Sequence, residues 1–126
     1  MNRNSLLLYI SASVEALTGI VTAVSPSTLV WLLWAVPLTV GGLLVARLTG
    51  FALISLAVAC WPLRNPGDEA RAIRAMLVYN VLAALYLLIV GARTQFVGVL
   101  LWPAVVFHAT MSVLFILALR PSQDKR

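Results

Sequence analysis

Long runs of apolar residues, separated by short polar segments, make up most of this chain of 126 residues. A run of about 20 apolar residues is long enough to cross the hydrocarbon core of a bilayer as a helix. The pattern predicts membrane spans at about residues 6–24, 37–61, 72–92 and 96–119. The predicted fold class is therefore all-α: a polytopic membrane protein whose single integral membrane domain, residues 1–126, is a four-transmembrane-helix bundle.

The second apolar stretch, residues 29–61, is too long for one straight crossing. Pro37 interrupts it near its start. We expect a short interfacial helix over residues 28–35, between spans 1 and 2. This division leaves Trp31 and Trp34 at the level of the lipid headgroups, where tryptophan is enriched.

The composition supports a membrane protein, because 62% of the residues are hydrophobic and only 10% are charged. Soluble domains have about a quarter of their residues charged, so a water-soluble globular domain is excluded. A disordered chain is excluded too, because disorder requires low hydrophobicity.

The net charge of +5 is distributed unevenly along the chain. The N-terminus, the loop between spans 2 and 3 and the C-terminal tail share seven basic residues: Arg3, Arg64, Arg71, Arg74, Arg120, Lys125 and Arg126. The opposite side has only Arg93. Because positive residues favour the cytoplasmic side, we expect both termini in the cytoplasm, in a membrane of the bacterial inner-membrane type. The basic residues are interpreted as topology signals, and no nucleic-acid partner is expected.

Each span contains one strongly polar residue near its middle: Glu15, Arg47, Asn80 and His108. At 1.5 Å per residue, they lie roughly 14, 21, 12 and 17 Å from the predicted cytoplasmic side. Polar side chains at such depth usually face the interior of a bundle. The sequence therefore predicts a central polar cluster.

Helical spacing adds three residues to the candidate site. Thr18 shares a stripe of the first helix with Glu15, and Tyr79 and Tyr86 flank Asn80 on the third. Within the cluster, Arg47 is expected to pair with Glu15. The cluster is then either a buried ion pair with a purely structural role or a working site. Because a buried ion pair is a poor way to gain stability, a working site is a serious alternative.

Few kinds of chemistry are indicated. The single Cys60 and the single histidine exclude an internal disulfide, a CxxC motif and bis-histidine haem, and no metalloprotease or nucleotide-binding motif is present. The cofactor is left unknown, with no metal site predicted.

The preferred function is a non-catalytic membrane protein whose cluster binds a small amphipathic ligand, either quinone-like or an anionic lipophile, or a partner membrane subunit. Two alternatives stay open. The first is a proton-linked transporter acting as a homo-oligomer, and the second is an intramembrane enzyme that uses the Glu, Arg and His residues.

The layout resembles the small DoxX-like four-helix bacterial membrane proteins. The resemblance rests on Glu15-x3-Gly19, Pro26 followed by the Trp31 and Trp34 segment, Arg47-x2-Gly50, Tyr79-Asn80 and Trp102-Pro103-x4-His108. It covers most of the chain as architecture. It implies an accessory or lipophile-binding role near membrane redox chemistry, and it assigns no catalytic residue.

Overall fold

The computed structural model describes residues 2–62 and 66–120, and this part of the chain is helical with no strand. Its helices are α1 (Arg3–Val24), α2 (Pro26–Trp34), α3 (Val40–Ala59), α4 (Pro66–Arg93) and α5 (Leu101–Leu119). Four of them, all but α2, are long and apolar enough to cross a membrane. The predicted all-α four-helix membrane bundle is confirmed.

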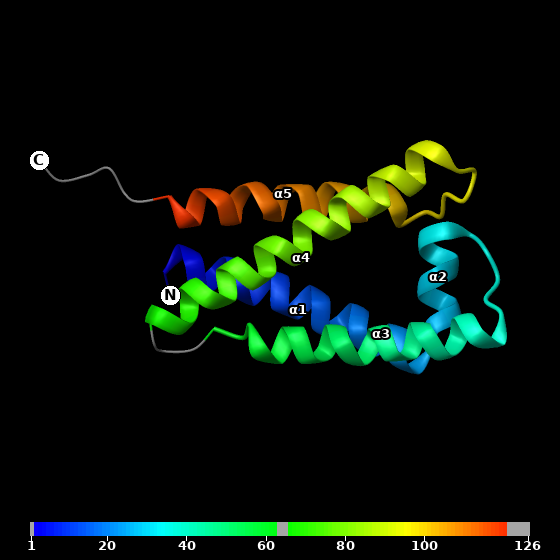
Figure 1. The fold of residues 1–126 in the computed structure, drawn as a ribbon, viewed down its shortest axis with the longest axis horizontal. Helices are drawn as coiled ribbons and strands as arrows, with labels where there is room; N and C mark the ends of the chain where they lie inside the picture. The colour runs from blue at the N-terminus through cyan, green and yellow to red at the C-terminus, as the bar shows by residue number, and fades with distance from the viewer. Residues whose placement is uncertain (1, 63–65, 121–126) are drawn as a thin grey trace, which may run out of the picture.

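The four long helices run lengthwise through the bundle, with α4 crossing it obliquely, and α2 lies across one end (Figure 1). Helix α1 packs against α3, and α4 packs against α5. Helix α1 also contacts α2, α4 and α5, so it is the central helix of the bundle. The start of α1, the end of α3, the start of α4 and the end of α5 share one end, here called the terminal end (Figure 1). The other end is called the α2 end.

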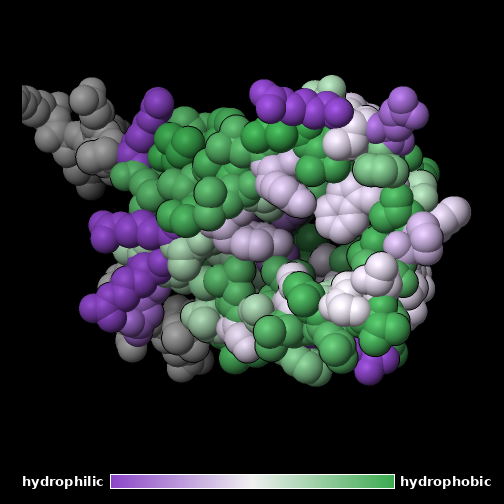
Figure 2. All heavy atoms as spheres, turned by 45° about the vertical axis from the view of Figure 1, so that its right-hand side comes forward, coloured by the Kyte–Doolittle hydropathy of each residue, from purple (hydrophilic) through white to green (hydrophobic). Residues whose placement is uncertain are grey.

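The outside of the bundle is apolar, as a lipid-facing surface must be. Hydrophobic side chains cover most of the face in Figure 2, and the strongly hydrophilic ones gather towards its margins. Large apolar side chains such as Val40, Leu48 and Val58 on α3 and Leu82 on α4 are more than half exposed. Exposure of this kind is stable in hydrocarbon and costly in water.

Two glycines allow α1 and α3 to touch. A Cβ atom added at Gly19 would lie 2.8 Å from the carbonyl oxygen of Gly50, and one added at Gly50 would lie 2.6 Å from the nitrogen of Ala23. In lipid, such close backbone contact is a main source of helix association. By contrast, a Cβ at Gly41 would meet nothing within 4 Å.

A tight apolar core fills the half of the bundle next to the terminal end. Leu8, Ile73, Met76 and Phe115 are at most 2% exposed, and they come from three different helices. Cys60, at the end of α3, belongs to the same core, as expected for a small buried hydrophobe. This core closes the terminal end beneath the polar residues described below.

Helix α4 begins at Pro66, earlier than the predicted span at 72. Proline was expected to stop a helix here, but at the first helical position it loses no backbone hydrogen bond. Asp68 and Glu69 then occupy the first turn, where the helix dipole favours negative charge. Residues 63–65 of the predicted loop lie outside the described residues.

The fourth membrane helix begins at Leu101, five residues after the predicted start of its span at 96. The preceding segment does not continue a helix, because its backbone bonds elsewhere. The N–H groups of Gly98 and Leu100 donate to the carbonyl oxygens of Leu33 and Leu32, both at 2.8 Å. These bonds satisfy two carbonyl groups that the end of α2 would otherwise leave unpaired.

The interfacial helix is present as α2, two residues ahead of its predicted start. Its position across the bundle end is the one that a helix lying in the headgroup layer would take (Figure 1). Trp31 is 58% exposed, as expected for an interface anchor. Trp34 is only half-buried, and its indole Nε1 is buried without a hydrogen-bond partner.

Substitution of Gly50 by alanine should destabilise the bundle by about 1–3 kcal/mol, because the new methyl group would press on backbone atoms that cannot move aside. The matched substitution Gly41→Ala should leave stability unchanged or slightly raised, because its methyl group meets open space. Thermal unfolding in detergent measures both. Equal melting temperatures for the two variants would show that the glycine contact does not hold α1 to α3.

Candidate functional site

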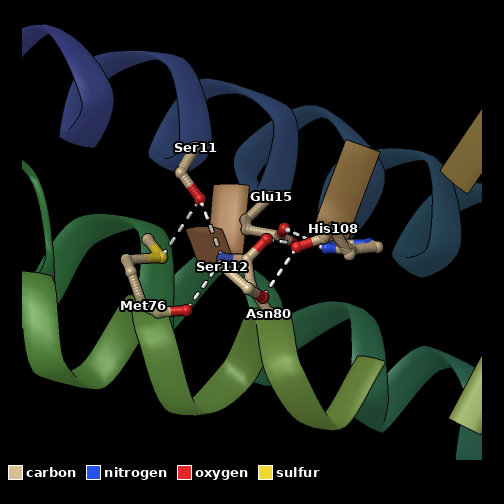
Figure 3. Close-up of polar contacts among 6 residues, drawn as sticks. All are labelled: Ser11, Glu15, Met76, Asn80, His108 and Ser112. Carbon is tan, nitrogen blue, oxygen red and sulfur yellow. Dashed lines mark hydrogen bonds and ion pairs between the residues drawn. The ribbon is translucent and has the colours of Figure 1, made fainter. Parts of the chain in front are cut away.

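Three helices bring their polar residues together in the middle of the bundle (Figure 3). Helix α1 supplies Ser11 and Glu15, α4 supplies Asn80, and α5 supplies His108 and Ser112. All of these side chains are buried. The predicted clustering of Glu15, Asn80 and His108 is therefore observed, and the five residues are called the polar cluster below.

Asn80 organises the cluster and is fully buried. Its amide nitrogen donates to the backbone carbonyl of Met76 at 2.8 Å and to the hydroxyl of Ser11 at 3.3 Å. Its amide oxygen lies 2.8 Å from Nδ1 of His108. Asn80 thus connects α4 to both α1 and α5.

These contacts fix which nitrogen of His108 carries a proton. The Met76 carbonyl can only accept a hydrogen bond, so the amide nitrogen of Asn80 must face it. The amide oxygen then faces His108 and accepts, which requires a hydrogen on Nδ1. In the neutral imidazole, Nε2 is therefore an acceptor, and it makes no hydrogen bond within the described residues.

Glu15 is 1% exposed and has an incomplete set of partners. Its Oε1 atom lies 4.0 Å from Nδ1 of His108, which gives an ion pair only when the imidazole is protonated. The side chain of Tyr79 lies close to the carboxyl group. Oε1 itself has no hydrogen-bond partner. A buried oxygen of this kind is costly unless something else binds it.

Arg47 does not join the cluster, so the predicted Glu15–Arg47 ion pair is not formed. Arg47 is exposed, and it makes no ion pair within the described residues. It lies seven residues after the start of α3, about 10 Å along the helix. From there its long side chain can reach the headgroups at the α2 end. The predicted depth of Arg47 did not show which face of α3 carries it.

The other predicted residues occupy the margins of the cluster. Tyr79 is half-buried, and its ring packs edge-on against that of His108, with centroids 5.7 Å apart. Thr18 is half-buried, and its backbone carbonyl accepts a bond from Thr22. Tyr86 is 60% exposed and lies outside the cluster.

Sequence analysis did not include Ser11 and Ser112 among the site residues. Ser11 lies on the polar stripe of α1, four residues before Glu15, and this spacing was the available signal. Ser112 donates to the carbonyl of His108 at 2.8 Å, within its own helix. Such a bond is common for serine in any membrane helix, so nothing in the sequence marks Ser112.

A separate pocket of about 460 Å³ lies beside α2, away from the polar cluster. It is lined by Ser27, Thr28, Trp31, Val36, Pro37 and Leu38. None of these side chains is charged, and none belongs to the predicted site. Within residues 2–62 and 66–120, no group of three or more His, Cys, Asp or Glu residues is placed to hold a metal ion.

No protein-family model, curated protein or solved structure matches this chain. The function must therefore be argued from the polar cluster itself.

Replacing Asn80 by leucine should lower the free energy of unfolding by about 1–3 kcal/mol, because it leaves Nδ1 of the buried His108 without its hydrogen-bond acceptor. Because Arg47 is exposed, Arg47→Gln should change the free energy of unfolding by less than about 0.5 kcal/mol. Thermal unfolding in detergent compares the two. A larger loss for Arg47→Gln would mean that the Arg47 side chain has a buried partner.

Proposed function

We propose that this integral membrane protein binds a small amphipathic ligand at Glu15 and His108. The observation that supports the proposal is the buried Oε1 atom of Glu15, which lacks a hydrogen-bond partner. An intramembrane ionisable residue is costly, and it is usually retained for a function. A ligand that donates a hydrogen bond to Oε1 would remove this cost when bound.

The free hydrogen-bonding positions define the class of ligand. When Glu15 is ionised and His108 is neutral, Oε1 and Nε2 are both acceptors. They complement a ligand with hydroxyl donors on an apolar ring, such as a quinol. An anionic lipophile fits less well, because the guanidinium of Arg47 lies outside the cluster. The quinone-like ligand is therefore preferred over the anionic one.

Binding of a short-tailed benzoquinol to the protein in nanodiscs, measured anaerobically by calorimetry, tests this proposal. Glu15→Gln keeps the shape of the side chain but removes its charge. A hydrogen bond to a charged group contributes about 1.5–3 kcal/mol, so the Kd should rise roughly 10- to 100-fold. Arg47→Gln serves as the control and should bind like the original protein. Equal affinity of the Glu15→Gln variant would refute the assignment.

A proton-linked transporter remains the second candidate, because Glu15 and His108 form a pair that can hold one proton between them. Transport requires that the ligand or proton reach both ends of the bundle. Proteoliposomes that bind the benzoquinol but show no proton flux would favour the binding protein.

We also propose that the terminal end faces the cytoplasm, in a bacterial-type inner membrane. The support is the excess of basic residues there: Arg3, Arg71, Arg74 and Arg120 all belong to helix ends or tails of this side. The resemblance to DoxX-like proteins stays a prediction that agrees with such a location.

Reporter fusions test the orientation. A reporter joined after Arg126 should behave as cytoplasmic, and one inserted at Thr94, at the α2 end, should behave as external. The reverse pattern would overturn the orientation, although it would leave the polar cluster unaffected.

A further inference from the structure

The polar cluster is closed towards the terminal end. Directly beneath it lie Leu8, Met76, Ile73 and Phe115, all at most 2% exposed. The chain of hydrogen bonds also stops there, because the Ser11 hydroxyl donates to the sulfur of Met76 at 3.5 Å. A thioether has no proton to pass on. Within residues 2–62 and 66–120, neither a ligand nor a proton has a route to Glu15 from this side.

Towards the α2 end, by contrast, the bundle opens sideways. Helix α4 crosses the bundle obliquely and moves away from α3 as it approaches the α2 end (Figure 1). Within the described residues, α3 packs on α1 and α2 but has no packed interface with α4. Figure 2 shows a hollow in this face, partly rimmed by side chains of intermediate hydropathy.

Tyrosines on one flank of α4 connect the opening with the cluster. The ring of Tyr79 packs edge-on against His108, so Tyr79 lies on the flank of α4 next to the polar cluster. Tyr86 follows seven residues later, so it occupies the same flank about 10 Å nearer the α2 end. There it is 60% exposed, because α1 and α3 no longer cover that flank.

We propose that the ligand enters the site laterally from the bilayer, between α3 and α4 and past Tyr86, and that its apolar tail remains among the lipids. This inference rests on the proposed binding function and adds the route and the ligand class. The ligand is a lipid-borne molecule, with a polar ring that reaches Glu15 and a tail of unrestricted length.

Tail length tests the lateral route. A benzoquinol with a ten-carbon tail and one with a tail of several isoprene units are titrated into the protein in nanodiscs, with partition into lipid measured separately. Each Kd is expressed as the concentration of ligand in the lipid phase. Lateral entry predicts that the Kd values of the two molecules agree within about three-fold. A pocket closed to lipid would bind the long-tailed molecule at least ten-fold more weakly, and that result would overturn the inference while leaving the proposed function intact. No binding of either molecule would refute both.

A second measurement tests the position of the entrance. Tyr86→Trp enlarges a side chain at the opening and should slow association and dissociation several-fold, with Kd changed less than two-fold. Leu88→Trp, nearly opposite Tyr86 on the same helix and 44% exposed, is the matched control and should change neither rate. Unchanged rates in Tyr86→Trp, or equal slowing in both variants, would place the entrance elsewhere.

Discussion

The contact between Gly19 and Gly50 fixes the geometry on which the bundle depends. Because neither residue has a side chain, the backbones of α1 and α3 meet within van der Waals distance. Hydrocarbon offers no hydrophobic driving force between helices, so close packing must supply most of the attraction. Glu15 and Ser11 lie one and two turns before Gly19 on nearly the same side of α1. At that level, α1 meets Asn80 of α4 and His108 of α5.

The polar cluster shows how a bilayer constrains buried polar groups. The hydrocarbon core of a bilayer supplies no water, so each buried polar group needs a partner from another helix or from its own backbone. Asn80 meets this requirement with three contacts, and Ser112 meets it within α5. Glu15 meets it only in part. The contrast separates residues that hold the helices together from the residue that has capacity left for a ligand.

The fold was largely predictable from the sequence, because span length and hydropathy are set by the bilayer and need no knowledge of packing. Three of the four mid-span polar residues also meet as predicted, since a polar residue at depth has few places to point. The failure concerned Arg47, which is long enough to reach the membrane surface from within a span. The start of α5 was also missed, because the backbone of residues 98–100 bonds to α2, a long-range contact that no local pattern encodes.

The bonds from Gly98 and Leu100 to the end of α2 have a consequence for the biogenesis of the protein. Ribosomes make the chain from its N-terminus, so α2 is complete before α3 and α4 exist and long before Gly98 is added. During that interval the carbonyl groups of Leu32 and Leu33 have no protein partner, and the hydrocarbon core would not tolerate them. Helix α2 must therefore stay in the hydrated headgroup layer until residues 98–100 have been synthesised and can bond to it. Its interfacial position is thus required by the order of synthesis as well as by the finished fold.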